Sequence, residues 1–592
     1  MKSKTTALWF VLAAALAAAI WILEHHFPPA APGDSRLLPG LRTADVAAVQ
    51  IIPAGAREIS VARTNHAWQL DKPLAYPAQA AAIESLLDAL EKLTPAIRLT
   101  AADMRGRKNA DAEFGFDNPQ FSLEITAGDQ AWHLRVGSRT APGDQVYVRV
   151  VGLDGAFVTD TAWLQFLPRS ANDWRDTALV GAADVFDWIV ITNGAKVIEL
   201  RRDPANQLWR MIRPLAARAD SAHIAAALQQ LKAARVTQFV TDDPKADWSA
   251  FGLQPAELDV WLGRGTNFTA AIHAGKNPPD HPAQLFVRRE GWNAVAATTQ
   301  EALSPWRGAV NDFRDPRLLD LATPVAEIEV RGENTYTLQR HGSNDWSLVG
   351  EKFSADAESA QAFLRQLAGL RVTGFEKDVN TAADLQGFGL ATPARQITLR
   401  ATAGDTNAVL AQLLLGAATT NKVFAKRADE DFVYALATAD VNRLPENGWE
   451  FRDRRLWNFS ETNVVQVTLH QSGKTRQLLR TGANAWSFAP GSQGIINPPA
   501  VEETVHRLGE LIVAGWAGRN ITVPEKFGLN PDNLQLTVEL KSGEKFTVDF
   551  GLELSQTALA AVTLDGERWA FVFPPVLYQL VAAYLTIPPN TP

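Results

Sequence analysis

The chain has 592 residues, of which 46% are hydrophobic and 21% are charged. A single hydrophobic core stops growing at about 250–300 residues, so this length predicts about four globular domains. The formal net charge is −8 and no run of Lys or Arg exceeds two residues, which argues against the basic face of a nucleic-acid-binding protein. The absence of cysteine excludes disulfides, thiolate nucleophiles, zinc–thiolate sites and iron–sulfur clusters.

An uncharged apolar run occupies residues 7–23. As a helix it is about 25 Å long, the short end of what spans a bilayer. Lys2 and Lys4 precede the run and Glu24 follows it, so the positive-inside rule places residues 1–6 in the cytoplasm. We therefore predict a single-pass anchor in the inner (cytoplasmic) membrane.

The remainder of the chain is then extracytoplasmic, in the periplasm, behind a spacer at residues 24–43 that is rich in Pro and Ala. Two alternatives remain open for the apolar run. It is also compatible with a cleaved signal peptide or with a buried helix of a soluble domain.

Four markers recur with a period of about 138 residues, and such self-similarity indicates internal duplication. The first is a Phe-Gly turn followed by Pro. Its copies are Phe114-Gly115…Pro119, Phe251-Gly252…Pro255, Phe388-Gly389…Pro393 and Phe527-Gly528…Pro531. The others are a Trp near a strand end, a Gly that closes a later strand, and an aromatic-Arg-Asp triplet. Their copies are Trp68, Trp209, Trp346 and Trp486; Gly137, Gly275, Gly416 and Gly551; and Trp174-Arg175-Asp176, Phe313-Arg314-Asp315 and Phe451-Arg452-Asp453.

The third copy shows the order of elements within one unit. Alternating strands are expected at residues 325–330, 336–340 and 346–348, followed by a helix whose apolar stripe runs from Ala360 to Leu370. A short strand and further strands complete the unit. They are expected at residues 371–375, 395–400 and 409–415. A short second helix, at residues 161–167 in the first copy, closes the unit.

This pattern predicts an α+β fold of four tandem homologous units in an elongated array, each a mostly antiparallel sheet with one main covering helix and a short second helix. The units span residues 44–180, 181–320, 321–459 and 460–592. The fourth unit lacks an Arg-Asp pair and ends in an apolar stretch at residues 576–587, which we expect to cap the array.

The recurring residues are interpreted as parts of the fold. In the turn, Gly permits positive φ and Pro fixes φ before the next strand, while the flanking aromatic pins the turn to the core. The Arg-Asp pairs are expected at unit junctions, where the Asp caps a turn and the Arg satisfies carbonyls or a carboxylate. A ligand-binding turn and a catalytic pair are the alternatives.

Motifs for nucleotide binding or hydrolysis are missing. Gly473-Lys474-Thr475 has the tail of a phosphate-binding loop, but it lies in an expected hairpin without a following helix. His273 and His281 flank a Pro-rich loop at residues 277–282 that only the second unit has, which makes this loop the best place for a unique ligand site. We predict no catalytic residue, no metal ligand and no cofactor.

With these markers in order, the chain resembles the bacterial domain-of-unknown-function 4340 family. The resemblance rests on the N-terminal anchor at residues 7–23, the Trp68-Gln69-Leu70 and Trp346-Ser347-Leu348 hairpins, the Phe-Gly turns, the Tyr147-Val148-Arg149 strand and the Arg-Asp pairs. It covers nearly the whole chain. The resemblance implies an envelope accessory that accompanies an ABC-type transporter related to gliding-motility export systems.

Three functions are compatible with the sequence. The first is a non-enzymatic scaffold at the inner membrane whose partner is an ABC transporter permease or another envelope protein. The second is a periplasmic module that binds glycans, peptides or lipids in Trp-lined clefts between units. The third is a hydrolase or transferase, which would need a polar pocket in one unit only.

Overall fold

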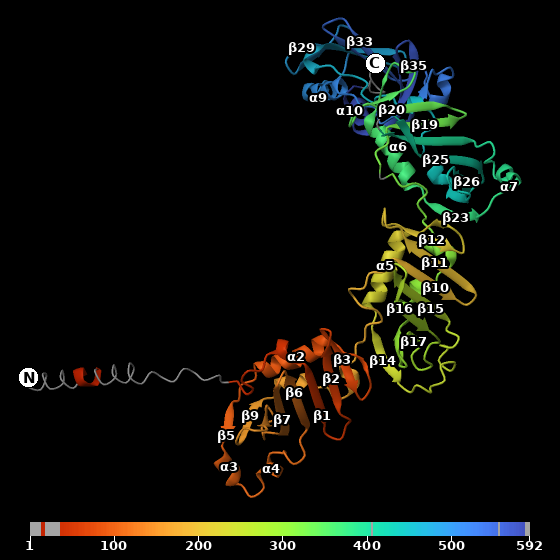
Figure 1. The fold of residues 1–592 in the computed structure, drawn as a ribbon. Coiled ribbons are helices and arrows are strands. Elements are labelled where there is room, and N and C mark those ends of the chain that lie inside the picture. Colours follow the sequence, from red (N-terminus) through yellow and green to blue (C-terminus); the bar gives the residue numbers. More distant parts are fainter. Residues whose placement is uncertain (1–12, 18–35, 322, 404–405, 555–556, 586–592) are drawn as a thin grey trace, which may run out of the picture. The chain divides into compact units, whose positions relative to one another are not determined.

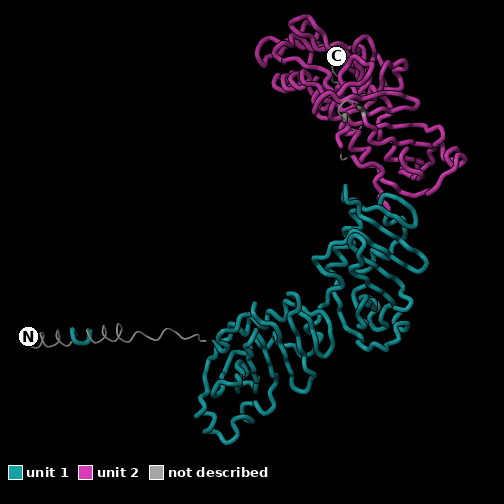
Figure 2. The backbone as a smooth tube through the Cα atoms, viewed as in Figure 1, with its two compact units in different colours: residues 1–313 teal, residues 314–592 magenta. Residues whose placement is uncertain are grey.

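The computed structural model describes residues 13–17, 36–321, 323–403, 406–554 and 557–585. The chain divides into two compact units, residues 1–313 and residues 314–592 (Figure 2). Each unit contains two antiparallel sheets, and we number the sheets and their surroundings repeats 1 to 4 (Figure 1).

Unit 1 contains two sheets of nine strands with the same strand order. The first is β4-β3-β2-β1-β6-β7-β8-β9-β5, with β1 (Ala48–Pro53), β2 (Ile59–Thr64), β3 (Ala67–Lys72), β4 (Tyr76–Pro77), β5 (Ile97–Leu99), β6 (Phe121–Ala127), β7 (Gln130–Arg139), β8 (Gln145–Val150) and β9 (Ala156–Asp160). The second is β13-β12-β11-β10-β15-β16-β17-β18-β14, with β10 (Trp188–Asn193), β11 (Lys196–Arg202), β12 (Trp209–Arg213), β13 (Ala217–Arg218), β14 (Val236–Thr241), β15 (Leu258–Arg264), β16 (Asn267–Ala274), β17 (Gln284–Arg289) and β18 (Val295–Thr299).

Unit 2 repeats this order, but its last sheet has eight strands. The third sheet is β22-β21-β20-β19-β24-β25-β26-β27-β23, with β19 (Glu327–Gly332), β20 (Tyr336–Arg340), β21 (Trp346–Leu348), β22 (Ser354–Ala355), β23 (Val372–Lys377), β24 (Arg395–Ala403), β25 (Thr406–Ala418), β26 (Lys422–Arg427) and β27 (Val433–Ala437). The fourth is β30-β29-β28-β32-β33-β34-β35-β31, with β28 (Val464–Gln471), β29 (Lys474–Gly482), β30 (Ala485–Phe488), β31 (Gly515–Arg519), β32 (Gln535–Leu540), β33 (Lys545–Leu554), β34 (Thr557–Leu564) and β35 (Glu567–Val572).

One main helix accompanies each sheet, inserted before the short strand that pairs at the far edge. These helices are α2 (Ala80–Glu91), α5 (Ser221–Ala233), α6 (Ala357–Gly369) and α9 (Pro498–Gly509). The other helices are short: α3 (Ala101–Arg105), α4 (Ala110–Glu113), α7 (Ala382–Gly387), α8 (Thr438–Val441) and α10 (Pro575–Tyr584). Short 3₁₀ turns complete the set, at η1 (Thr43–Asp45), η2 (Ala162–Phe166), η3 (Ala171–Asp173), η4 (Gln300–Ala302), η5 (Ser304–Arg307), η6 (Val310–Phe313), η7 (Gly448–Phe451), η8 (Glu461–Asn463) and η9 (Pro524–Phe527).

The apolar stripes predicted from the sequence place the main helices against the sheets. In α2 the buried residues are Ile83, Leu86, Leu87 and Leu90, which follow the spacing of one helix face. Side-chain caps begin three of the four helices, because the residue before each is Asp or Asn. Asp220 caps α5, Asp356 caps α6 and Asn497 caps α9. The predicted tandem repetition and antiparallel sheets are therefore confirmed.

The second helix of each unit is less regular than predicted. In repeat 1 the predicted helix at residues 161–167 is the 3₁₀ turn η2, which ends just before Pro168. In repeat 4 the apolar stretch forms the longer helix α10, which packs against α9 and buries Leu577, Val581 and Leu585. This position therefore accommodates helices of different length and type.

The predicted anchor at residues 7–23 falls mostly outside the described residues. Of this run the structure describes residues 13–17, which are helical. Among the residues that it describes, no helix is both long and apolar enough to cross a bilayer.

Candidate functional site

The two recurring glycines meet in every repeat. The turn glycines Gly115, Gly252, Gly389 and Gly528 all have positive φ, between 66° and 77°. The strand glycines lie against these turns. A Cβ atom on Gly137, Gly275, Gly416 or Gly551 would come within 2.0–2.3 Å of the carbonyl oxygen of the turn Phe. In repeat 1 the Ser138 N–H also donates to that oxygen, at 2.8 Å. Turn and strand thus form one lock that only glycine admits.

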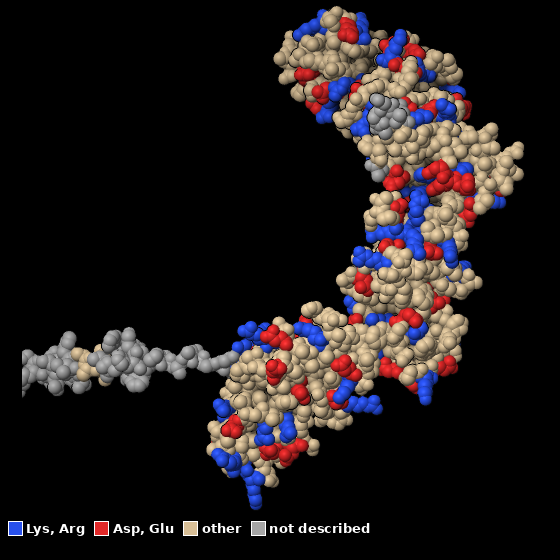
Figure 3. All heavy atoms as spheres, in the orientation of Figure 1, with Lys and Arg blue, Asp and Glu red and all other residues tan. Residues whose placement is uncertain are grey.

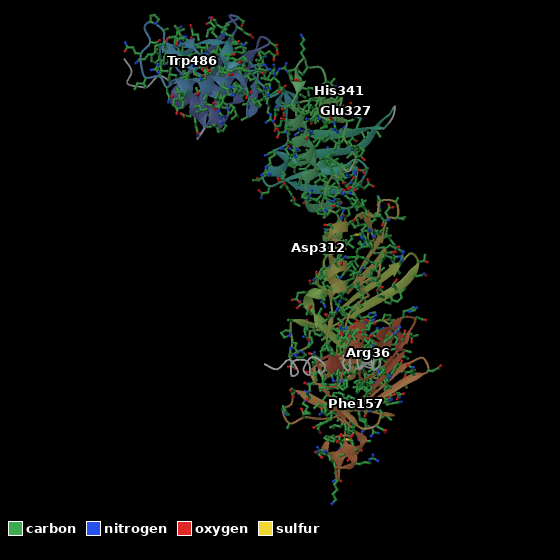
Figure 4. The ribbon with its side chains drawn as sticks, turned by 90° about the vertical axis from the view of Figure 1, so that its left-hand side faces the viewer. Arg36, Phe157, Asp312, Glu327, His341 and Trp486 are labelled. Carbon is green, nitrogen blue, oxygen red and sulfur yellow. The ribbon has the colours of Figure 1, made fainter. Side chains whose placement is uncertain are left out.

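The four marker tryptophans lie in the cores. Trp68, Trp209, Trp346 and Trp486 are at most 6% exposed. Trp486 is labelled in Figure 4 within repeat 4. Among the described residues no tryptophan is classed as exposed. Indoles at these positions therefore stabilise the repeats and do not offer a stacking surface to a ligand.

The predicted Arg-Asp pairs lie in segments that join sheet edges, at residues 174–178, 313–317 and 451–455, which we call the junction segments. In unit 1 the Asp176 N–H donates to the Pro77 carbonyl of β4, at 2.8 Å, while the Val236 N–H of β14 donates to the Thr177 carbonyl, at 2.7 Å. In unit 2 residues 451–455 do the same, because Asp453 N–H donates to Ser354 and Val513 N–H to Arg454. Within each unit this segment therefore hydrogen-bonds the edge of one repeat and the start of the next.

Arg175 is fully buried, and its guanidinium lies over two aromatic rings that also touch each other. Its Cζ is 3.6 Å from the Phe239 ring centre and 4.2 Å from that of Tyr76. Asp242 accepts two hydrogen bonds from it, at 2.8 and 3.0 Å. Burial raises the pKa of the Tyr76 hydroxyl, although the charges of Arg289 and Arg175 oppose this. We call this arrangement the arginine clamp.

Two further clamps lie in unit 2. Arg314, at the start of this unit, is 3.9 Å from the Phe375 ring centre and pairs with Asp378 at 2.6 Å. Arg452 lies 4.6 Å from the Trp569 ring centre and pairs with Asp565 at 3.2 Å.

The Asp of each pair holds the turn that follows. Its side chain accepts a hydrogen bond from the backbone N–H two residues later, at 2.9 Å in all three copies. The accepting pairs are Asp176 with Ala178, Asp315 with Arg317 and Asp453 with Arg455. This is an Asx turn, which accounts for Asp at this position.

The sequence did not reveal what the arginines bind. Phe239 and Phe375 each precede an Asp by three residues, at Asp242 and Asp378, and this spacing was an available signal. Residues Asp34-Ser35-Arg36-Leu37-Leu38 also repeat the pattern of Asp315-Pro316-Arg317-Leu318-Leu319, with Gly33 in place of the clamp arginine.

His273 shows how the polar groups of repeat 2 are used. It is 7% exposed, and its Nδ1 and Nε2 lie 2.6 Å from Asp259 and 2.8 Å from Glu290. Burial by itself raises the pKa of Glu290, but the His273 hydrogen bond and the Arg288 charge leave that pKa below its ordinary value. The imidazole is held by its neighbours on the sheet, and within the described residues no hydrogen bond joins it to His281 of the predicted loop.

In each sheet, residues that pair across three neighbouring strands form a row. Two adjacent rows differ in burial and in residue type. One row is aliphatic and almost completely buried in all four repeats. Its members are Ile51–Leu123–Leu134, Ile191–Val260–Ile272, Val330–Ile397–Leu413 and Leu469–Leu536–Val548. The adjacent row points to the opposite face. Its members are Ile52–Ser122–Arg135, Thr192–Asp259–His273, Arg331–Gln396–Leu414 and His470–Gln535–Asp549.

This second row, which we call the outer row, has a different chemistry in each repeat. It lines hollows of about 390 Å³ in repeat 1 and about 600 Å³ in repeat 4. In repeat 4 Asp549 accepts hydrogen bonds from Gln535 and Arg568, both at 2.7 Å, and His470 is bonded to the Thr475 hydroxyl. Asp549 and Arg568 of this hollow therefore neutralise each other.

Two other observations bear on chemistry. Within the described part of the chain, no group of three or more His, Asp or Glu is placed to hold a metal ion. Lys, Arg, Asp and Glu are interspersed over the face shown in Figure 3, as expected of a solvated surface without a basic stripe.

The comparison with known families supplies the identity. The model of the family described as Domain of unknown function (DUF4340) matches residues 68–207, 209–386 and 376–533, well over half of the chain. The chain therefore belongs to the DUF4340 family, as a tandem-repeat member. The first two matches start at the marker residues Trp68 and Trp209. No curated protein and no solved structure matches the chain.

Proposed function

We propose that the protein is a non-catalytic scaffold of the cell envelope. In this proposal residues 7–23 tether it to the inner membrane, and the repeats are extracytoplasmic and bind an ABC-type transporter, related to gliding-motility export systems, or another envelope protein. One observation carries the proposal: the four repeats share their buried rows and differ in the outer rows. Constant interiors with variable faces suit a protein that presents several distinct binding surfaces.

The recurring polar groups support the same proposal. The turn glycines form locks, the arginines stack in clamps and the aspartates form Asx turns, so each has a structural role that explains its recurrence. A feature that recurs in three or four units is a poor candidate for a single active site.

Affinity capture from crosslinked membranes tests this function. The tagged full chain should recover a transporter permease or another envelope protein, and reproducible recovery of no protein would contradict the proposal. Ile52→Asp and Arg135→Glu, in the outer row of repeat 1, are expected to reduce recovery because they change an exposed surface. As a matched control, Arg57→Glu alters an exposed hairpin residue outside that row and should leave recovery unchanged.

A second candidate is a periplasmic module that binds glycans, peptides or lipids. The buried marker tryptophans weigh against stacking clefts, so this candidate depends on the polar hollow of repeat 4. Titration with soluble cell-wall fragments, monitored through chemical shifts of the Gln535 side-chain amide, would detect such binding. A saturable shift that is lost in Asp549→Ala would favour this candidate over the scaffold.

A further inference from the structure

One face of the second sheet differs from the same face of the other three sheets. Each aliphatic row has the outer row on one side and a further row on the other side, and both point to the same face. We call this further row the flanking row. Its members are Gln50–Glu124–His133, Val190–Trp261–Ala271, Glu329–Thr398–Gln412 and Thr468–Thr537–Thr547. The flanking row is polar in repeats 1, 3 and 4 and apolar in repeat 2.

The polar flanking rows form hydrogen bonds within themselves. In repeat 3 the Gln412 side chain donates to the Thr398 hydroxyl at 3.3 Å, and in repeat 4 the Thr537 and Thr547 hydroxyls are 2.9 Å apart. Polar side chains of this kind are typical of a sheet face in contact with water. The shared fold therefore accepts a polar row at this place, and it does not require the apolar row of repeat 2.

Three aromatic side chains form a patch on this face of repeat 2. Trp188 and Phe268 both pair with Gly263, and a Cβ atom on this glycine would lie 2.3 Å from Cε3 of Trp188. The Trp261 ring centre is 5.1 Å from that of Phe268. Phe268 is 45% exposed, and both tryptophans are partly exposed. We call Trp188, Trp261 and Phe268 the aromatic patch. The other repeats have Ala48, Glu327 and Gln466 at the position of Trp188.

Arginines of β11 and β12 border the aromatic patch. The Arg201 Cζ lies 4.6 Å from the Trp188 ring centre, and Arg210 pairs with Arg201 across the two strands. Glu199 lies 3.2 Å from Arg201 and 3.3 Å from Arg213. The Arg213 side chain is 69% exposed, whereas that of Glu199 is 15% exposed. This border therefore has three positive charges and one negative charge, in a chain whose net charge is negative.

Two further carboxylates of this sheet are bonded elsewhere. Asp259 and Glu290 lie 2.6 and 2.8 Å from the two ring nitrogens of His273, and Arg288 also pairs with Glu290, at 3.1 Å. The excess positive charge at the border of the patch is thus available to a partner. Partly exposed rings beside such a border suit a partner that combines an apolar side chain with carboxylates, because ring burial supplies affinity and charge supplies orientation.

We propose that the aromatic patch and its arginine border bind an acidic segment of a partner protein. An apolar side chain of this segment packs against Trp261 and Phe268, and its carboxylates lie near Arg210 and Arg213. An uncharged glycan also stacks on aromatic rings, but it leaves the positive border without a counter-charge. The inference rests on the proposed scaffold function, because it names one surface for a partner and the chemistry of what binds there.

A fluorescent synthetic peptide of alternating glutamate and alanine with one central tryptophan tests the patch. Its binding to the full chain is measured by anisotropy. Saturable binding is expected, and the matched peptide with lysine in place of glutamate should not bind. Trp261→Thr gives this position the residue that repeats 3 and 4 have, and it should weaken binding about tenfold. Arg210→Glu combined with Arg213→Glu should weaken binding by a similar factor and reduce its salt dependence.

Ile52→Asp is the matched control, because Ile52 is an apolar residue of the first sheet with a similar exposure, 43%. This variant should leave peptide binding unchanged. Circular dichroism of each variant checks that the fold is retained. Phe268→Ser removes the most exposed ring of the patch and is expected to weaken binding as well, so the test does not depend on the folding of one variant.

Equal binding of the two peptides, or undiminished binding to Trp261→Thr, would overturn the proposal. Saturable binding of a soluble N-acetylglucosamine oligomer that Trp261→Thr abolishes would also overturn it, because the patch would then be a glycan site. Membrane capture provides the independent readout. Recovery of an envelope protein together with a failed peptide test rejects the role of the aromatic patch alone, whereas peptide binding without any recovered partner rejects the scaffold function.

Discussion

The clamps of Arg175 in unit 1 and Arg452 in unit 2 occupy equivalent junction segments but are neutralised differently. Arg175 pairs with Asp242, three residues after Phe239. In unit 2 the residue three positions after Trp516 is Arg519, which pairs with Glu567 at 2.8 Å and Glu351 at 2.5 Å, while Arg452 pairs with Asp565. The aromatic stack and the backbone pairing are therefore the constant parts of a clamp. The position of its carboxylate is variable.

The largest expected difference between the two clamps is the loss of stability when its arginine is removed. Arg175→Ala is expected to destabilise unit 1 by about 3 kcal/mol, because it removes a fully buried side chain from its contacts with Tyr76 and Phe239 and leaves a cavity there. Arg452→Ala should cost unit 2 about 1 kcal/mol, because Arg452 is 13% exposed and Asp565 is 81% exposed. Hydrogen exchange of β14 and β31 in the full chain measures the two stability losses. Equal losses would contradict the expected difference between the two clamps.

Reversing the variable charge gives a smaller effect. Asp242→Arg should destabilise unit 1 by about 2 kcal/mol, since it places a second guanidinium beside the buried Arg175. Arg519→Asp should cost unit 2 about 1 kcal/mol, because Glu351 and Glu567 lose their partner while Arg452 gains one. Urea denaturation of the two variants provides the measurement, and a more stable Asp242→Arg protein would show that the pair is not formed.

The Asx turns should respond alike in both units. Asp176→Ala and Asp453→Ala each remove one side-chain hydrogen bond to the backbone, and each is expected to cost about 1 kcal/mol. Asn at either position keeps the acceptor and serves as the matched control. A loss confined to one unit would mean that the turns are not equivalent.

The smallest expected effect is a change in the pKa of one carboxyl group of unit 2. The hydrogen bond from Arg519 lowers the pKa of the Glu567 carboxyl, so its contribution is present above the unfolded pKa of about 4 and is lost as pH falls through the lower folded pKa. Arg519→Leu should move the Glu567 midpoint upward in a ¹³C-detected carboxyl titration. The Glu461 carboxyl, whose pKa is lowered mainly by its hydrogen bond with His506, should not move, and a joint shift would indicate a general change of fold.

Local patterns predicted much of the fold. The apolar stripe of α2 was predicted from its spacing, and β20 (Tyr336–Arg340) has the predicted bounds. The 3₁₀ turn η2 was predicted as a helix because periodicity over a few residues does not distinguish the two. The sequence also marked Gly115 and Gly137 separately without indicating that they touch, because their contact depends on how distant strands pair.

The clamp partners were missed for a related physical reason. Arg175 and Asp242 are 67 residues apart in the sequence, and their contact depends on how the junction segment pairs with both sheets. In repeat 4 the position equivalent to Asp242 holds Arg519. A search for residues that recur in every repeat therefore finds no carboxylate there. Residues that recur in every repeat can be found from the sequence alone. A partner residue that is replaced in one repeat, with its role taken by another residue, leaves no periodic pattern.

The similarity of the junction segments also means that one repeat can be deleted from the chain while a complete junction sequence is kept. Because residues 174–178 and 313–317 share sequence and bonding pattern, deletion of residues 176–314 joins Arg175 to Asp315 and recreates a complete aromatic-Arg-Asp triplet at the splice. The shortened chain retains Phe375 and Asp378 to receive the arginine. A single in-frame deletion of this kind would remove one whole repeat and keep the sequence of the junction segment intact.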